Sequence, residues 1–263
     1  MNVLPIKIKK EINARIIATI HEYECFTLKR KIRYKLNFKK LDQIIVAEEE
    51  FISAIKKDFK NVDVKYVKIS SNIPRSRISQ EEKEKLIEKY DLKCKNVISY
   101  FGFALPSKGI EYVLKAIPEF EDTKLLFINE LNENNEYHKS LLDLIDKLKI
   151  KDKVVITGLF DAPEDVADLL SVSDVCVLPF LNGVKTRNGS FLAAYNQKIK
   201  VITTSDDLKD KEGIYYVEPR NEEKLLEKMK IVLESKDKFE RNELTWESVA
   251  KNYIESFEEV TKR

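Results

Sequence analysis

Three absences narrow the classes to which this 263-residue chain can belong. No apolar run approaches the roughly 20 residues of a transmembrane helix, so the sequence predicts no membrane span. The first ten residues lack the apolar core of a secretory signal. The three cysteines are odd in number and far apart, which predicts neither a disulfide framework nor a zinc knuckle. We therefore expect a cytoplasmic protein.

Charge is nearly balanced overall but unevenly distributed along the chain. Residues 1–90 carry 21 Lys and Arg against 13 Asp and Glu, a net charge of +8. Because the whole chain carries +2, the remainder carries −6. The apolar content of 43% is sufficient for substantial cores. The asymmetry indicates two units with different roles.

The segment from Val154 to Thr204 has the clearest pattern in the sequence. Short apolar runs alternate with helical patterns, in the order Val154–Thr157, Pro163–Leu170, Val175–Leu178, Phe191–Asn196 and Val201–Thr203. Such alternation predicts a parallel sheet covered by helices on both faces. Ligands of these sheets bind beyond the carboxyl ends of the strands. The loop Pro179–Ser190 ends there, before a helix N-terminus, and is a candidate anion site.

The alternation extends from about residue 92 to residue 235 and predicts six strands in a doubly wound α/β domain. We assign residues 80–240 to this domain. Residues 1–79 have room for about three strands and are interpreted as a partial Rossmann-like domain ending in a linker, Ser70–Ser79. Residues 241–263 are interpreted as a terminal helix that packs back towards the first domain.

Several of these segments resemble motifs of GT-B glycosyltransferases of the family 4 type (glycosyl transferases group 1), which bind a nucleotide-sugar donor. The matching segments, in chain order, are Ala18–Tyr23 (ATIHEY), Ser70–Pro74 (SSNIP), Tyr100–Gly109 (YFGFALPSKG), Val154–Gly158, Asp174–Pro179, Ser190–Asn196, Lys200–Ile202 and the final helix. The resemblance implies a GT-B fold with one complete Rossmann-like C-terminal domain and a partial N-terminal one. It also implies transfer of a sugar with retention of anomeric configuration.

The chain departs from the family pattern at three places. The family's two Glu residues, in the loop and helix after the fourth strand of the second domain, are Lys185 and Ala193 here. The family's Arg after the first Gly of the YFGFALPSKG segment is Phe103. The N-terminal domain is about half the expected size, so we expect either a truncated chain or a second chain that completes the sheet.

The leaving diphosphate of a nucleotide-sugar needs positive charge near it, from cationic side chains and helix N-termini. Lys108, at a predicted helix start, and Arg187, in the Pro179–Ser190 loop, are the candidate cations. The candidate donor-binding residues are Gly102, Lys108, Gly158, Arg187, Gly189 and Ser190. For Lys108 an ordinary surface lysine is the alternative, and for Arg187 an exposed loop arginine beside a helix-capping Ser190.

His21 stands at the carboxyl end of a predicted strand and is the third candidate catalytic residue, for contact with the transferred sugar or the acceptor. A structural histidine is the alternative. We expect no metal, since the adjacent acids Asp206 and Asp207 are weak evidence for one and the resemblance implies none. No cofactor is expected beyond the nucleotide-sugar substrate.

The predicted helix Leu28–Phe38 lies in a stretch, Lys29–Lys40, that carries seven basic residues and no acidic one. Such a stretch can contact an anionic membrane, which would place the protein at the inner face of the membrane; a solvated helix face is the alternative. Nucleic acid is not expected as a partner, since few aromatic residues interleave with the basic ones.

The sequence therefore predicts a metal-independent glycosyltransferase that moves a hexose to a glycan or lipid-linked acceptor in the synthesis of polysaccharides or glycoconjugates. The alternative is a catalytically incomplete partner subunit or a degenerate nucleotide-sugar-binding module.

Overall fold

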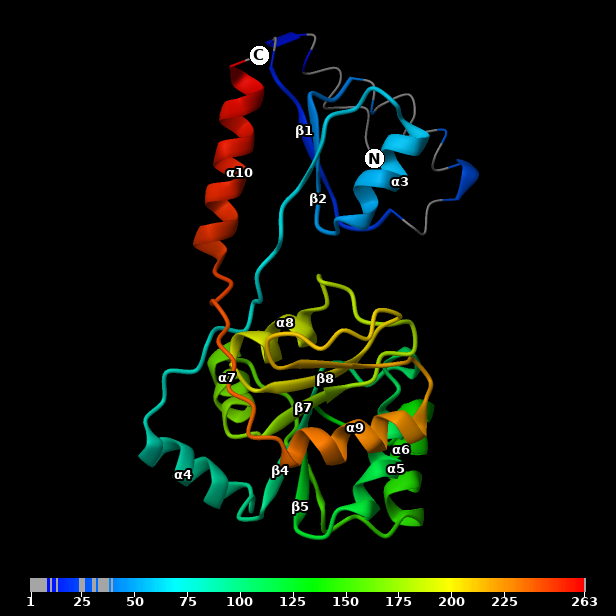
Figure 1. Cartoon of the computed structure of the whole chain (residues 1–263), viewed down its shortest axis with the longest axis vertical. Coiled ribbons are helices and arrows are strands. Elements are labelled where there is room, and N and C mark those ends of the chain that lie inside the picture. Colours follow the sequence, from blue (N-terminus) through cyan, green and yellow to red (C-terminus); the bar gives the residue numbers. More distant parts are fainter. Residues whose placement is uncertain are drawn as a thin grey trace. The chain divides into compact units, whose positions relative to one another are not determined.

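The computed structural model describes residues 9, 11–12, 14–23, 27–29, 32, 38 and 40–262. The chain divides into two compact units (Figure 1). Unit 1 consists of Met1–Ser70 and Leu244–Arg263, and unit 2 consists of Ser71–Glu243. The chain therefore crosses between the units twice, between Ser70 and Ser71 and between Glu243 and Leu244.

The described part of unit 1 contains a parallel three-stranded sheet in the order β1-β2-β3. Its strands are β1 (Ile17–Ile20), β2 (Gln43–Val46) and β3 (Val64–Tyr66). The central strand β2 is completely buried, which explains its continuous run of apolar residues. The three strands agree with the number for which the sequence has room.

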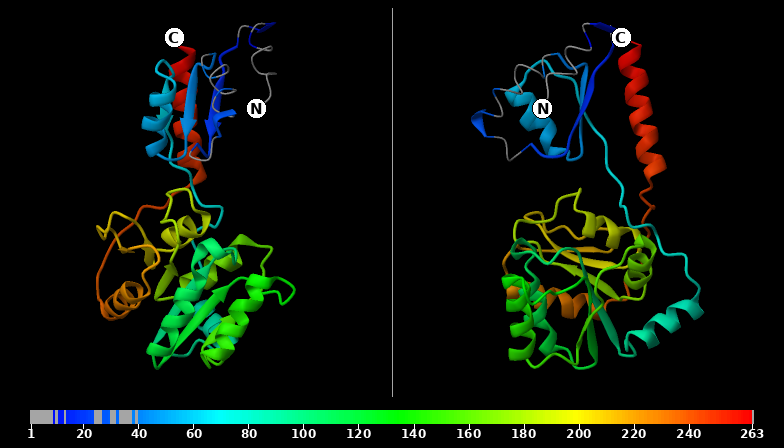
Figure 2. Two further views of the ribbon diagram at one scale, coloured as in Figure 1. Left: turned by 90° about the vertical axis from the view of Figure 1, so that its right-hand side faces the viewer. Right: turned by 180° about the vertical axis from the view of Figure 1, so that it is seen from behind.

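Two helices cover opposite faces of this sheet, α3 (Glu50–Asp58) and α10 (Trp246–Thr261) (Figure 2). Phe51 and Ile55 of α3 join one core cluster, together with alternate residues of the strands. Val249 of α10 packs with Ile45 and Val67 on the other face. The terminal segment therefore forms a helix that belongs to unit 1. The predicted helix Leu28–Phe38 lies largely outside the described residues.

Unit 2 is built on a parallel six-stranded sheet in the order β6-β5-β4-β7-β8-β9. The strands are β4 (Asn96–Phe101), β5 (Thr123–Ile128), β6 (Val154–Ile156), β7 (Val175–Leu178), β8 (Lys200–Thr204) and β9 (Ile214–Val217). The sequence predicted six strands in this unit, and the three whose ranges it gave, Val154–Thr157, Val175–Leu178 and Val201–Thr203, agree with β6, β7 and β8 within one residue at each end. The order reverses between β4 and β7, as in a doubly wound Rossmann-like sheet.

The helices of unit 2 follow from this order. They are α4 (Gln80–Lys89), α5 (Ile110–Ala116), α6 (Glu136–Lys147), α7 (Pro163–Ser171), α8 (Gly189–Asn196) and α9 (Glu222–Glu234). Right-handed crossovers place α5 and α6 on one face and α8 on the other, since they lead away from the centre of the sheet in opposite directions. α5 packs against both α6 and α9, whereas α8 packs against β7 and β8.

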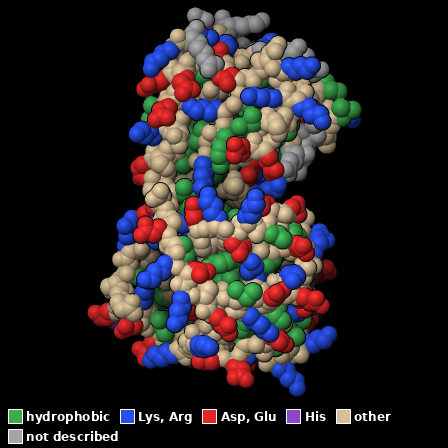
Figure 3. Space-filling model, viewed as in Figure 1, with side chains coloured by type: hydrophobic (Ala, Val, Ile, Leu, Met, Phe, Trp, Pro, Cys, Tyr) green, Lys and Arg blue, Asp and Glu red, His purple; other side chains and the backbone are tan. Residues whose placement is uncertain are grey.

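Charged side chains of both signs are interspersed over the visible surface (Figure 3). This pattern is typical of a solvated surface rather than of a field of one sign. No helix in the described part of the chain is both long and apolar enough to cross a membrane.

Candidate functional site

The point at which the strand order reverses lies between β4 and β7 of unit 2. In doubly wound sheets this point leaves a crevice outside the carboxyl ends of the two strands, and ligands bind there. The segments that follow these two strands are Gly102–Lys108 and Pro179–Asn188. Most of the candidate residues in unit 2 lie on them or at the start of α8.

The loop after β4 is held by side chains from three places. The Tyr100 hydroxyl donates to the Phe103 carbonyl at 3.2 Å, and the Asn129 amide donates to the Gly102 carbonyl at 2.6 Å. His138 Nδ1 accepts from the Asn132 N–H at 3.0 Å, which places the imidazole proton on Nε2. Nε2 then donates to the Ala104 carbonyl at 3.0 Å. The loop is therefore fixed before any ligand binds.

Lys108 ends a short 3₁₀ turn, Pro106–Lys108. Its Nζ lies 4.6 Å from the centroid of the Phe180 ring, at the end of β7. The side chain is half-buried, and burial lowers the pKa of the ammonium group. No carboxylate lies within ion-pair distance of it among the described residues. A partly desolvated cation of this kind is a suitable partner for an anionic ligand.

Gly109 separates Lys108 from α5 and is the reason that the two segments can meet. Its φ of +65° is left-handed, and a Cβ atom there would lie 2.3 Å from the Pro179 carbonyl oxygen. Only glycine permits this approach. The sequence placed Lys108 at the start of a helix; this was wrong, because Gly109 lies between Lys108 and α5, which begins at Ile110.

The first residues after β7 are held in place by backbone and side-chain bonds. The Leu181 N–H donates to the Ser107 carbonyl at 3.0 Å, which ties this loop to the Lys108 turn. The Thr204 hydroxyl donates to the Phe180 carbonyl at 2.5 Å, and the Val184 N–H donates to the Thr204 carbonyl at 2.7 Å. The loop is therefore anchored to β8 and to the turn that follows β4.

The N-terminus of α8 is open at this position. Its N-cap residue, Asn188, does not cap it, since the side-chain oxygen accepts from the Lys185 N–H at 2.6 Å instead. The interpretation of Ser190 as a helix cap was wrong, because α8 begins at Gly189 and Ser190 lies inside the first turn. The first N–H groups of a helix have no intrahelical partner, so they are available to an anion.

Gly102 and Ser190 are brought together although they are far apart in the sequence. A Cβ atom on Gly102 would lie 3.1 Å from Ser190 Cβ, and Gly102 has a φ of +130°. The first turn of α8 therefore lies directly against the loop after β4. A Cβ atom added to Gly189 would meet no other atom within 4 Å, so the backbone there is open to a ligand.

Asn129 links a third strand to the site, and sequence reasoning missed it. Its side chain donates to Gly102, and its carbonyl accepts from the Gly158 N–H at 3.2 Å. Gly158 has a φ of +80° with open space on its Cα, and the next residue, Leu159, is exposed. The signal that could have identified Asn129 is its position, as a polar residue directly after β5, the strand that pairs with β4.

The candidate residues therefore fall into groups. Gly102, Lys108, Gly189 and Ser190 lie at the reversal point. Arg187 is half-buried in the same loop as Lys185. Gly158 is connected to them through Asn129. His21 follows β1 in unit 1 and is exposed. The roles assigned to these residues stay predictions.

Two of the residues that depart from the family pattern lie in different environments. Ala193 is completely buried in α8, and Phe103 is 75% exposed on the loop after β4. Among the described residues, no group of three or more His, Cys, Asp and Glu side chains is arranged to hold a metal ion.

Comparison with known proteins agrees with this geometry. The family model of glycosyl transferases group 1 matches residues 95–235, more than half of the chain. No curated protein sequence matches the chain.

Solved structures share the fold at low sequence identity. A glycosyltransferase from Rickettsia africae ESF-5 superposes with a TM-score of 0.77 at 16% identity, covering 99% of this chain and 80% of that one. Sucrose-phosphate synthase from Thermosynechococcus elongatus has a TM-score of 0.74 at 14% identity, covering 98% and 71%. Anabaena Alr3699/HepE, solved with UDP and glucose, has a TM-score of 0.74 at 14% identity, covering 97% and 74%. These structures show a GT-B fold. Because the family model matches more than half of its residues, the chain belongs to the glycosyl transferases group 1 family.

Proposed function

We propose that the chain transfers a hexose from a nucleoside diphosphate sugar to a glycan or a lipid-linked acceptor. The observation that carries the proposal is the half-buried Lys108, which lies over the Phe180 ring and has no carboxylate partner among the described residues. The uncapped start of α8 lies at the same reversal point of the sheet. The structure of HepE with UDP supports a nucleotide as the ligand of this fold.

The proposed reaction separates charge at the bond between the sugar and the diphosphate. As the glycosidic C–O bond breaks, negative charge grows on the leaving diphosphate. Lys108, the amides of Gly189 and Ser190, and Arg187 are proposed to stabilise that charge without a metal ion. Gly102 and Gly158 are proposed to leave room for the donor, with Gly158 next to the nucleobase. His21 is proposed to contact the transferred sugar.

Calorimetric titration with UDP and with GDP tests the donor site. We expect one of them to bind, and Lys108→Ala and Arg187→Ala each to weaken that binding by about 10-fold or more, as expected for lost charge-assisted contacts. His21→Asn should leave nucleotide binding unchanged and lower transfer. The proposal would be contradicted if neither UDP nor GDP bound.

A second candidate function is a non-catalytic partner subunit or a degenerate nucleotide-sugar-binding module. The exposed Phe103 and the buried Ala193, at positions where the family has Arg and Glu, favour it. Hydrolysis or transfer of the donor sugar by the isolated chain separates the two functions. Nucleotide binding without turnover, or turnover only with a second polypeptide, would support this candidate.

We further propose that the acceptor pathway is polysaccharide or glycoconjugate synthesis at an anionic membrane surface. The support is the basic composition of Lys29–Lys40, most of which lies outside the described residues. Sedimentation with vesicles of phosphatidylglycerol and phosphatidylcholine tests it. Binding should weaken with added salt and on replacing Lys29 and Lys40 by Glu; binding equal to that of neutral vesicles would contradict it.

A further inference from the structure

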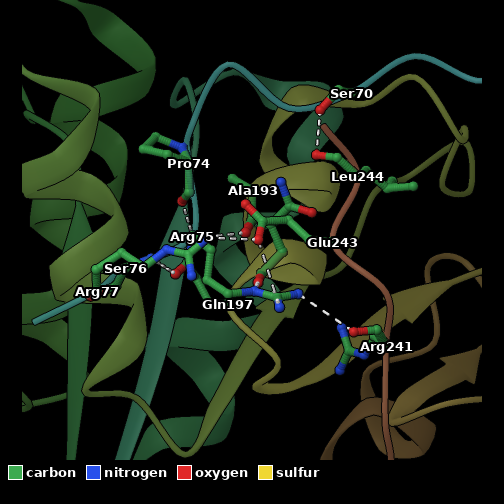
Figure 4. A network of polar contacts seen from close by, with 11 residues as sticks. Ser70, Pro74, Arg75, Ser76, Arg77, Ala193, Gln197, Arg241, Glu243 and Leu244 are labelled. Carbon is green, nitrogen blue, oxygen red and sulfur yellow. Dashed lines mark hydrogen bonds and ion pairs between the residues drawn. The ribbon is translucent and has the colours of Figure 1, made fainter. Parts of the chain in front are cut away.

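The C-terminal end of α8 is held by two arginines that come from distant parts of unit 2 (Figure 4). The last carbonyl groups of a helix have no intrahelical partner. Arg241 Nη1 donates to the Tyr195 carbonyl at 3.2 Å, and Arg75 Nε donates to the Asn196 carbonyl at 2.7 Å. The two guanidinium groups therefore serve as side-chain caps at the negative end of the helix.

Arg241 is an unusual residue because it is a buried cation. It is 3% exposed, and its guanidinium carbon lies 5.1 Å from the centroid of the Tyr195 ring and 4.6 Å from that of the Phe239 ring. Nη2 donates to the Ile199 carbonyl as well. Among the described residues no carboxylate lies within ion-pair distance of it. Carbonyl oxygens and the end of α8 accept its hydrogen bonds, and Glu212 attracts its charge from farther away. Burial lowers its pKa to about 10, and it stays charged at neutral pH.

Arg75 is connected both to α8 and to Arg241. Its Nη2 lies 3.5 Å from the Arg241 carbonyl, and Nη1 lies 3.8 Å from a Glu243 carboxylate oxygen. Gln197, the residue after α8, accepts from the Ser76 N–H at 2.8 Å and donates to the Pro74 carbonyl at 2.6 Å. The segment around Arg75 is therefore fixed to the end of α8 by backbone and side-chain bonds.

These arginines lie in the two segments by which the chain crosses between the units. Residues 71–79 follow the first crossing, and residues 236–243 precede the second. Both segments are attached to α8 at its C-terminal end, whereas the candidate anion site lies at its N-terminal end. A helix of this length spans about 12 Å, so its two ends move together.

We propose that α8 couples occupancy of the anion site to the two crossing segments, 71–79 and 236–243, with Arg75 and Arg241 as the positioning residues. This inference rests on the proposed function, because it needs an anion at the start of α8. A bound diphosphate complements the positive end of the helix dipole and the guanidinium groups complement the negative end, so both orient the same element. Linkage requires the effect to be reciprocal.

Hydrogen exchange of the full chain, with and without saturating UDP or GDP, tests the coupling. We expect the bound nucleotide to slow exchange in Pro179–Asn196 and also in peptides from 71–79 and 236–243, by about 5-fold or more, the lower end of typical coupling. Protection of Pro179–Asn196 with no change in the crossing segments would overturn the inference and leave the proposed function standing. No protection anywhere with either nucleotide would overturn both.

Three variants assign the coupling to the arginines. Arg75→Gln should remove the nucleotide-induced protection of 71–79, keep that of Pro179–Asn196, and raise the Kd for the nucleotide by about 5-fold, as reciprocity demands. Arg241→Lys keeps the charge and, by losing the fork of donors, should reduce the protection of 236–243. Arg77→Gln is the matched control, since Arg77 bonds Glu243 at 3.1 Å but not α8. Coupling unchanged in Arg75→Gln and Arg241→Lys, or equally lost in Arg77→Gln, would overturn the inference.

Discussion

At the scale of single residues, Lys108 illustrates a conflict between stability and function. Burial lowers the pKa of its ammonium group, so the folded state holds this proton less tightly than the unfolded chain does. The charged form therefore costs stability at neutral pH, and this cost disappears as the pH rises through the folded pKa.

Lys108→Met should accordingly leave the free energy of unfolding within about 1 kcal/mol of the wild type, or raise it. UDP or GDP affinity should fall by about 10- to 100-fold, because the variant lacks a charged partner for the diphosphate. Urea unfolding at neutral and alkaline pH, together with calorimetry, measures both. Any excess stability of the variant should shrink as the pH rises; a gap that widens would contradict the argument.

Substitution of two glycines of the site distinguishes the cost of backbone strain from the cost of a steric clash. Gly109 and Gly158 both have left-handed φ angles, but only Gly109 has a backbone atom in the path of a Cβ. Gly158→Ala should lower the free energy of unfolding by about 1 kcal/mol. Gly109→Ala should lower it by about 3 kcal/mol, since Pro179 must also move. Equal losses in chemical denaturation would show that the clash is relieved elsewhere.

At the scale of elements, α4 depends on its cap. None of its residues is buried, and its N-terminus has a capping box in which Ser79 and Glu82 bond each other's backbone N–H. The backbone hydrogen bond from Ser79 is the main reason that the pKa of Glu82 is lowered. The stabilisation is therefore present above the usual glutamate pKa and is lost as the pH falls through the lowered value.

Ser79→Ala should destabilise α4 by about 1 kcal/mol and speed amide exchange in its first turns several-fold. Lys85→Ala is the comparison, since it removes only an exposed i,i+4 pair with Glu81, which contributes a few tenths of a kcal/mol. Exchange mass spectrometry of peptides from residues 79–90 measures both variants. Similar amide exchange rates in the two variants would mean that the capping box stabilises α4 no more than the exposed ion pair does.

The elements of unit 2 were largely predictable from the sequence. Val175–Leu178 was predicted with the bounds that β7 has, and Pro163–Leu170 ends one residue before α7 does. Continuous apolar runs and helical spacing are local properties, so they are visible without tertiary contacts. The break at Gly109 was not, because it results from the contact of Gly109 with the Pro179 carbonyl, which lies far away in the sequence.

At the scale of the whole molecule, each unit has its own core, so we expect two unfolding transitions. Phe127 is 1% exposed and stacked on Tyr100, so Phe127→Ala should destabilise unit 2 by about 3–5 kcal/mol. Phe51→Ala, also at a 1% exposed site, should shift the transition of unit 1 instead. Scanning calorimetry measures both; a single transition shifted alike by the two variants would contradict this.

The order of strands and helices, the doubly wound sheet and the family of the chain follow from the sequence by itself, because they depend on periodicity and on motifs a few residues long. Only the tertiary structure decided that Lys108 lies on Phe180, that Asn129 joins Gly102 to Gly158, and that Arg241 and Arg75 hold the end of α8. Each of these contacts joins residues on different elements. The spacing of these residues along the chain therefore does not indicate how close they lie in the folded structure.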